Sequence, residues 1–148
     1  MARNGFDTSM LDDYVRDMMG MASAVLPKES KKFLKKSARA LNKVQKNTFK
    51  RFGIGESGII EREILASIKT GKTYKRNGAL NCRAYCSHPL GHLFDAGYIH
   101  MGGFDEKTGI ETWVEGYHFM EKAEESYKAG YYRDVQDFLD DMLDNHGL

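Results

Sequence analysis

A long amphipathic segment between Pro27 and Phe52 constrains the fold of this chain more than any other feature of its sequence. Proline suits the first turn of a helix and Gly53 suits its end, so the sequence predicts one helix over residues 27–52. At about 100° per residue, seven cations fall within a strip about 80° wide, opposite a mainly apolar side. This basic strip consists of Lys28, Lys32, Lys35, Arg39, Lys43, Lys46 and Lys50, and the opposite side of Phe33, Leu34, Ser37, Leu41, Val44 and Phe52.

The other periodicities predict an α+β fold in a single domain over residues 1–148. Its helical N-terminal part, 1–52, begins with a first helix from about Ser9 to Val25, and a Gly-rich connection covers 53–58. Residues 59–148 are expected to form a small antiparallel sheet of about four strands with a long C-terminal helix packed on it. The expected segments are 60–66 and 88–96 for short helices, 67–75, 79–86, 98–101 and 110–114 for strands, 102–109 for an exposed loop, and 117–143 for the long helix.

The first strand pair is expected to be a hairpin around Arg76-Asn77-Gly78, and two registers are open. A two-residue turn pairs Tyr74 with Asn81. A three-residue loop instead places apolar groups on one face, and we expect this register because a slip of one residue would turn those groups to the other face. Its pairs are Tyr74 with Leu80, Thr70 with Ala84, and Ile68 with Cys86.

The net charge of +1 conceals a split along the chain. Residues 1–76 carry 17 Lys or Arg against 8 Asp or Glu, which gives +9, and residues 77–148 carry −8. Like charges on one helical strip repel one another, so we expect the basic strip to meet DNA phosphates or an acidic protein surface. In a head-to-tail ring the acidic surface would be the strip on the last helix, which consists of Asp134, Asp137, Asp140, Asp141 and Asp144.

Four residues of the types that bind zinc, Cys82, Cys86, His88 and His92, lie close together in the sequence. They lack the tight two-residue spacing of a zinc knuckle, so we expect reduced thiols and no metal. Neither a nucleophile elbow nor a phosphate-binding glycine loop occurs, and we predict no enzyme activity and no cofactor. No apolar run approaches the roughly 18 residues of a membrane span, and the start does not resemble a signal peptide, so cytoplasmic synthesis without membrane contact is expected.

Three motifs follow one another between Ile64 and Leu143. They are Leu65-Ala66-Ser67-Ile68 before a lysine-rich hairpin, Ser87-His88-Pro89-Leu90-Gly91-His92-Leu93-Phe94-Asp95-Ala96-Gly97, and Val114-Glu115-Gly116-Tyr117-His118-Phe119-Met120 before an acidic helix that ends Phe138-Leu139-Asp140-Asp141-Met142-Leu143. In order and spacing they resemble a phage family of minor tail components, the tail-completion or neck proteins that join head to tail. The family usually has Glu where Asp95 stands, and the N-terminal part agrees only in being helical.

This resemblance implies a structural virion protein of the tail or neck, assembled in the host cytoplasm. It implies a ring of copies of the chain, with six expected, between the head connector and the tail-terminator or tail-tube proteins, with genome DNA passing through the lumen. Its scaffold positions would be His92, Asp95, Gly97, Gly116 and His118, whose glycines permit turns and whose imidazoles bond nearby loops. A tail terminator is the alternative phage role, and a small DNA-binding regulatory protein that uses the basic strip is the alternative outside it.

Overall fold

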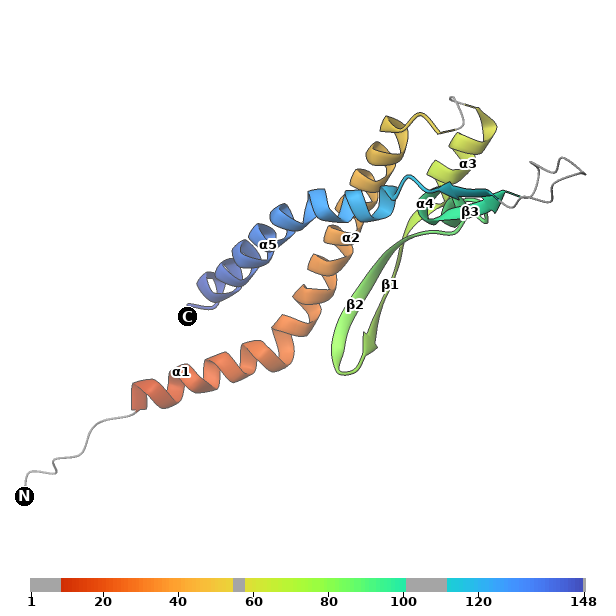
Figure 1. Cartoon of the computed structure of the whole chain (residues 1–148). Helices are drawn as coiled ribbons and strands as arrows, with labels where there is room; N and C mark the ends of the chain where they lie inside the picture. Colours follow the sequence, from red (N-terminus) through yellow and green to blue (C-terminus); the bar gives the residue numbers. More distant parts are fainter. Residues whose placement is uncertain (1–8, 55–57, 101–111, 148) are drawn as a thin grey trace, which may run out of the picture.

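The computed structural model describes residues 9–54, 58–100 and 112–147. It opens with a continuous helical rod of three parts, α1 (Ser9–Gly20), the π-helical segment η1 (Met21–Val25) and α2 (Leu26–Arg51). The predicted boundary at Pro27 is no interruption, because this proline lies in the first turn of α2, where its missing N–H is not needed. The rod instead changes direction near η1 (Figure 1), as π-helical segments commonly kink helices.

The second part of the chain follows the predicted order of elements, and its boundaries differ from the expected ones by no more than three residues. The elements are α3 (Ile59–Ser67), β1 (Ile68–Arg76), β2 (Ala79–Cys86), α4 (Gly91–Ala96), β3 (Gly97–His100), β4 (Thr112–Glu115) and α5 (Phe119–Asn145). The loop expected over 102–109 lies outside the described residues. In the part of the chain that the structure describes, none of the helices has both the length and the hydropathy to cross a bilayer.

The fold mixes helices with sheet, but the prediction of one sheet with about four strands is wrong. The strands form two separate antiparallel pairs, β1 with β2 and β3 with β4. The prediction that the C-terminal helix packs on the sheet is also wrong, because α5 packs mainly along α2 (Figure 1). Stacked rings hold these helices together, with the Phe33 and Phe138 centroids 4.6 Å apart. The β1–β2 hairpin packs on α2 as well.

The register of the β1–β2 hairpin agrees with the prediction at its base and differs at its tip. Ile68 pairs with Cys86 and Thr70 with Ala84, as expected, but Tyr74 pairs with Asn81. The register shifts between Thr70 and Thr73, where β1 holds one more residue than β2. The tip is the two-residue turn, with Asn77 at φ 51° and Gly78 at φ 76°, because this turn requires positive φ at both positions.

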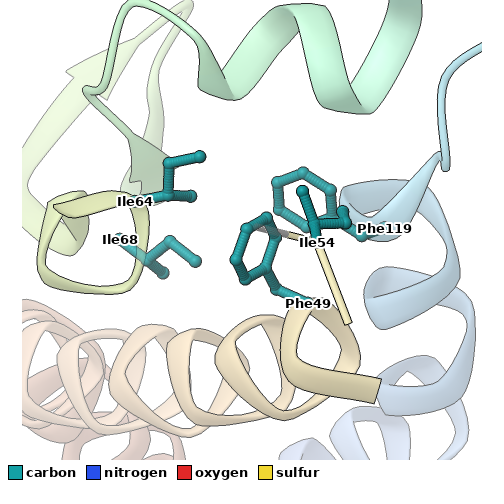
Figure 2. Packing of buried hydrophobic residues seen from close by; sticks show 5 residues of the cluster. All are labelled: Phe49, Ile54, Ile64, Ile68 and Phe119. Atoms are coloured by element: carbon teal, nitrogen blue, oxygen red, sulfur yellow. The ribbon is translucent and has the colours of Figure 1, made fainter. Parts of the chain in front are cut away.

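The hydrophobic core lies where the end of α2, helix α3 and the start of α5 meet. Figure 2 shows its five buried residues, Phe49, Ile54, Ile64, Ile68 and Phe119. The rings of Phe49 and Phe119 meet edge to face at a centroid distance of 5.1 Å. The predicted inner side of α2 omitted Phe49, because the buried face of this helix is turned towards the hairpin and includes polar side chains. The buried residues of α2 are Ser37, Ala38, Asn42, Gln45, Thr48 and Phe49.

Candidate functional site

The basic strip is largely exposed on α2, and one of its members, Lys32, lines a groove between α2 and α5. All its side chains are exposed except Lys46, which is half-buried. The helix as a whole carries ten Lys or Arg and one acidic residue, Glu29, whose carboxylate lies 3.0 Å from the Lys32 ammonium. Within the described residues, no other cation of the strip takes part in an ion pair. The strip is therefore largely uncompensated on its own helix.

The β1–β2 hairpin extends this basic strip, which the sequence analysis missed. The Asn42 amide donates to the Thr70 hydroxyl, so β1 lies against α2 immediately beside Lys43. The hairpin contains no Asp or Glu, and its five cations are all exposed. These are Lys69, Lys72, Lys75, Arg76 and Arg83. A hairpin without any acidic residue was visible in the sequence, but its contact with α2 was not.

Aromatic side chains accompany the cations of the hairpin. Tyr74 is exposed, and the Arg83 guanidinium lies 5.5 Å from the centroid of the Tyr85 ring. A Cβ at Gly71 would lie 3.5 Å from both Arg83 and Tyr85, so these groups share one face of the hairpin. Cations interleaved with aromatic rings are typical of surfaces that bind nucleic acid.

The acidic strip of α5 is exposed, and part of it faces α2 within the same chain. Asp134, Asp137 and Asp141 line a groove between α5 and α2, and Lys32 and Lys36 line its other side. No ion pair joins the two sides among the described residues. The two charged strips thus face each other in part within one chain, whereas the two remaining aspartates, Asp140 and Asp144, do not line this groove.

Asp95 connects α4 to the start of α5. Its side-chain oxygen accepts a hydrogen bond of 3.0 Å from the backbone N–H of Met120, in the first turn of α5. Its backbone carbonyl accepts a second one, 2.9 Å long, from the N–H of His118. The carboxylate satisfies a helix N-terminus that no capping side chain of its own serves. We name this connection the α4–α5 joint.

Two glycines make the α4–α5 joint possible. Gly97 has φ 102°, and a Cβ there would lie 2.6 Å from the carbonyl oxygen of Val114. A Cβ at Gly116 would overlap the backbone of Asp95, although its φ is not in the positive range. Gly97 thus adopts a backbone conformation that favours glycine, and Gly116 lies where the close approach of the Asp95 backbone leaves no room for a side chain.

His118 belongs to the same joint, whereas His92 does not. His118 has φ 53°, and its Nε2 lies 2.5 Å from a Glu115 carboxylate oxygen. The Trp113 indole N–H donates to the other oxygen at 2.9 Å, and this bond, followed by the one to His118, lowers the pKa of Glu115. His92 is exposed, and no hydrogen bond of its side chain is present among the described residues.

The cysteines and the neighbouring histidine occupy separate environments. The Cys86 sulfur lies 3.2 Å from the Ser67 hydroxyl, and both thiols are free and half-buried. The His88 ring lies 3.2 Å from a Glu63 carboxylate oxygen on α3. Within the described residues, no three side chains of His, Cys, Asp or Glu converge as metal ligands.

Comparison with known proteins identifies no relative of this chain, so a function has to be argued from the chemistry of its surfaces. We found no family model that matches this chain, and no curated protein or solved structure to which it is detectably similar. The charged surfaces and the α4–α5 joint therefore carry the functional argument.

Proposed function

We propose that this chain is a structural virion protein that completes a phage tail or neck, as a ring joining the head connector to the tail tube. The α4–α5 joint is the observation that carries the proposal. Two of the three motif segments that resemble the tail-completion family, 87–97 and 114–120, meet there, and Asp95, Gly97, Gly116 and His118 act through backbone geometry and hydrogen bonds. Roles of this kind are the ones that the resemblance leads us to expect of scaffold positions, and they support the proposal. His92 has no part in this joint.

The charged surfaces supply contacts for the proposed ring, with six copies expected. Lys35, Arg39, Lys43 and Lys50, together with the hairpin cations, form an exposed basic surface that faces either DNA in the lumen or an acidic neighbour. Asp140 and Asp144 lie outside the groove shared with α2 and offer carboxylates to a neighbour. Because such contacts are screened by salt, ring formation through them weakens steeply as the salt concentration rises.

The proposal is tested by deleting the gene from the phage or prophage that encodes it and examining particles by electron microscopy. Separate heads and tails that join again when the wild-type gene is supplied are the expected result. Supplying a gene with Asp140→Lys and Asp144→Lys tests the acidic contact, and Glu121→Lys with Glu125→Lys, two exposed positions of α5 outside this strip, is the charge-matched control. Normal, infectious particles after the deletion would contradict a role in joining head to tail.

The basic surface of α2 and the hairpin favours a second candidate function, that of a small DNA-binding regulatory protein. Cations and aromatic rings on a two-stranded ribbon suit the phosphate backbone of DNA. A stable monomer or dimer that binds duplex DNA tightly, with no particle defect after gene deletion, would establish this candidate. A hexameric ring, or heads and tails that fail to join, would exclude it.

A further inference from the structure

Helix α1 presents an apolar stripe that no other described part of its chain covers. Not one of its residues is buried, and Met10 and Met19 are 84% and 68% exposed. At about 100° per residue, most of the large apolar side chains fall within one arc of less than half the circumference. The stripe consists of Met10, Leu11, Tyr14, Val15 and Met18. An apolar arc of this extent on a soluble helix marks an interaction surface.

The position of α1 keeps this stripe away from the body of its own chain. The helix continues α2 through η1 and projects beyond both α5 and the hairpin (Figure 1). Since no described part of the same chain covers the stripe, another molecule is the natural partner for it.

The same chain also has an open apolar groove. It runs between α2, β2 and α5, and its lining is mainly aliphatic and aromatic. Leu34 and Leu41 line it from α2, Cys82 from β2, and Tyr131 and Tyr132 from α5. Tyr132 is 61% exposed, although its ring faces a groove that an apolar side chain could fill. An amphipathic helix in an apolar groove is a common mode of protein recognition.

The charge of α1 identifies the kind of surface that it fits. The helix carries three Asp and one Arg, so its polar side is acidic. Helices that lie on membranes carry Lys and Arg on the polar side, and surfaces that bind nucleic acid are basic, so both partners are disfavoured. The lining of the groove itself carries one acidic residue, Glu124, and one cation, Lys128. Around it, α2 and the hairpin carry fifteen cations against one acidic residue, and α5 carries three cations against eight acidic residues, so the surroundings are net positive. An acidic helix is attracted to such a surface.

We infer that α1 docks into the α2–β2–α5 groove of a second copy of this chain. The contact joins two different surfaces, so it is head to tail and leads to a closed ring or to exchange between two chains. The apolar stripe fills the groove, and Asp12, Asp13 and Asp17 lie near the cations of the receiving copy. The inference concerns self-association and does not depend on a role in the virion.

Cys82 lines the groove and allows a direct test with the full-length chain. Met18→Cys places a thiol on the apolar stripe, and Arg16→Cys places one on the opposite side of the same helix as a matched control. The purified proteins are oxidised mildly at high concentration and separated on non-reducing gels. Met18→Cys is expected to give dimers and longer ladders at least tenfold more efficiently than Arg16→Cys. Adding Cys82→Ser to Met18→Cys is expected to abolish these products.

Three results would overturn the inference. Equal cross-linking of Met18→Cys and Arg16→Cys would mean that the stripe is not specifically docked. Products that survive Cys82→Ser would place another surface, such as α1 of a second copy, against the stripe. Monomers alone at the highest concentration would exclude the contact. Because this test uses purified protein, its failure leaves the particle phenotype unaffected, and normal particles after gene deletion would leave the cross-link unaffected.

Discussion

Helices α1 and α2 are consecutive in the sequence and both amphipathic, yet α2 buries six residues and α1 buries none. The difference lies in what surrounds them. The hairpin and α5 pack against α2, whereas α1 projects past both (Figure 1). An amphipathic pattern thus identifies the apolar side of a helix, but the rest of the fold decides whether that side is covered.

The largest expected effect compares an apolar residue from each helix. Phe49→Ala should lower the free energy of unfolding by about 3–5 kcal/mol, because it leaves a cavity beside Phe119 in the core. Tyr14→Ala, in the uncovered stripe, should change it by less than about 0.5 kcal/mol in the dilute monomer. Urea unfolding of both variants measures the difference. Equal losses would mean that α1 is covered within its own chain.

The end of α1 and the α4–α5 joint differ in the same way in what surrounds a glycine. Gly116→Ala should cost about 1–3 kcal/mol, because a methyl group there overlaps the Asp95 backbone and forces it to move. Gly20→Ala, at the end of α1, meets nothing within 4 Å and should be neutral or raise helical stability by up to about 1 kcal/mol. Thermal unfolding followed by circular dichroism distinguishes the two. A stable Gly116→Ala protein would show that the joint is loosely packed.

A smaller effect is expected from two carboxylates. Asp95→Ala should cost about 1 kcal/mol, because the first turn of α5 loses its hydrogen bond to the Met120 N–H. Asp13→Ala removes an exposed ion pair with Arg16 and should cost less than about 0.5 kcal/mol. Chemical denaturation of the two variants at pH 7 measures both values. Comparable losses would argue against a capping role for Asp95.

The smallest effect is a dependence on pH at Glu115. The hydrogen bond from Trp113, and then that from His118, lowers the pKa of this carboxyl in the folded protein. A lowered folded pKa contributes stability that is present above the ordinary pKa near 4.5 and lost as the pH falls below it. Glu115→Gln should therefore reduce the loss of stability on acidification. Urea midpoints at pH 7 and pH 3.5, followed by Trp113 fluorescence, test this, and identical pH profiles of variant and wild type would contradict it.

Much of the local structure was predictable from periodicity and turn residues. The helix from Ser9, the strand Ala79–Cys86 and the exposed basic strip agree with the pattern of the sequence. The tip of the hairpin was not predicted, because matching apolar faces favoured one register along the whole strand. The extra residue between Thr70 and Thr73 lets the base keep that register while Asn77 and Gly78 form a two-residue turn.

The candidate surfaces were likewise predictable in part from the sequence. The cations of α2 and the aspartates of α5 were predictable as two strips, since helical spacing determines which residues share a side. Periodicity could not predict that Lys32 faces Asp134 and Asp137 across a groove, because the packing partner of α5 depends on contacts between distant segments. The contact of Asn42 with Thr70 brings the hairpin cations beside the strip. It was not predictable either, because it also joins segments that are distant in the sequence.

By itself, the sequence determined the types of its elements and the distribution of charge along them, because both follow from local spacing and backbone preference. Only the tertiary structure decided that four strands form two pairs, that α5 packs on α2, and that the apolar stripe of α1 stays exposed. The physical reason is that burial depends on which distant segments meet. An apolar face on α1 and one on α2 obey the same local rule, and only their neighbours in space distinguish them.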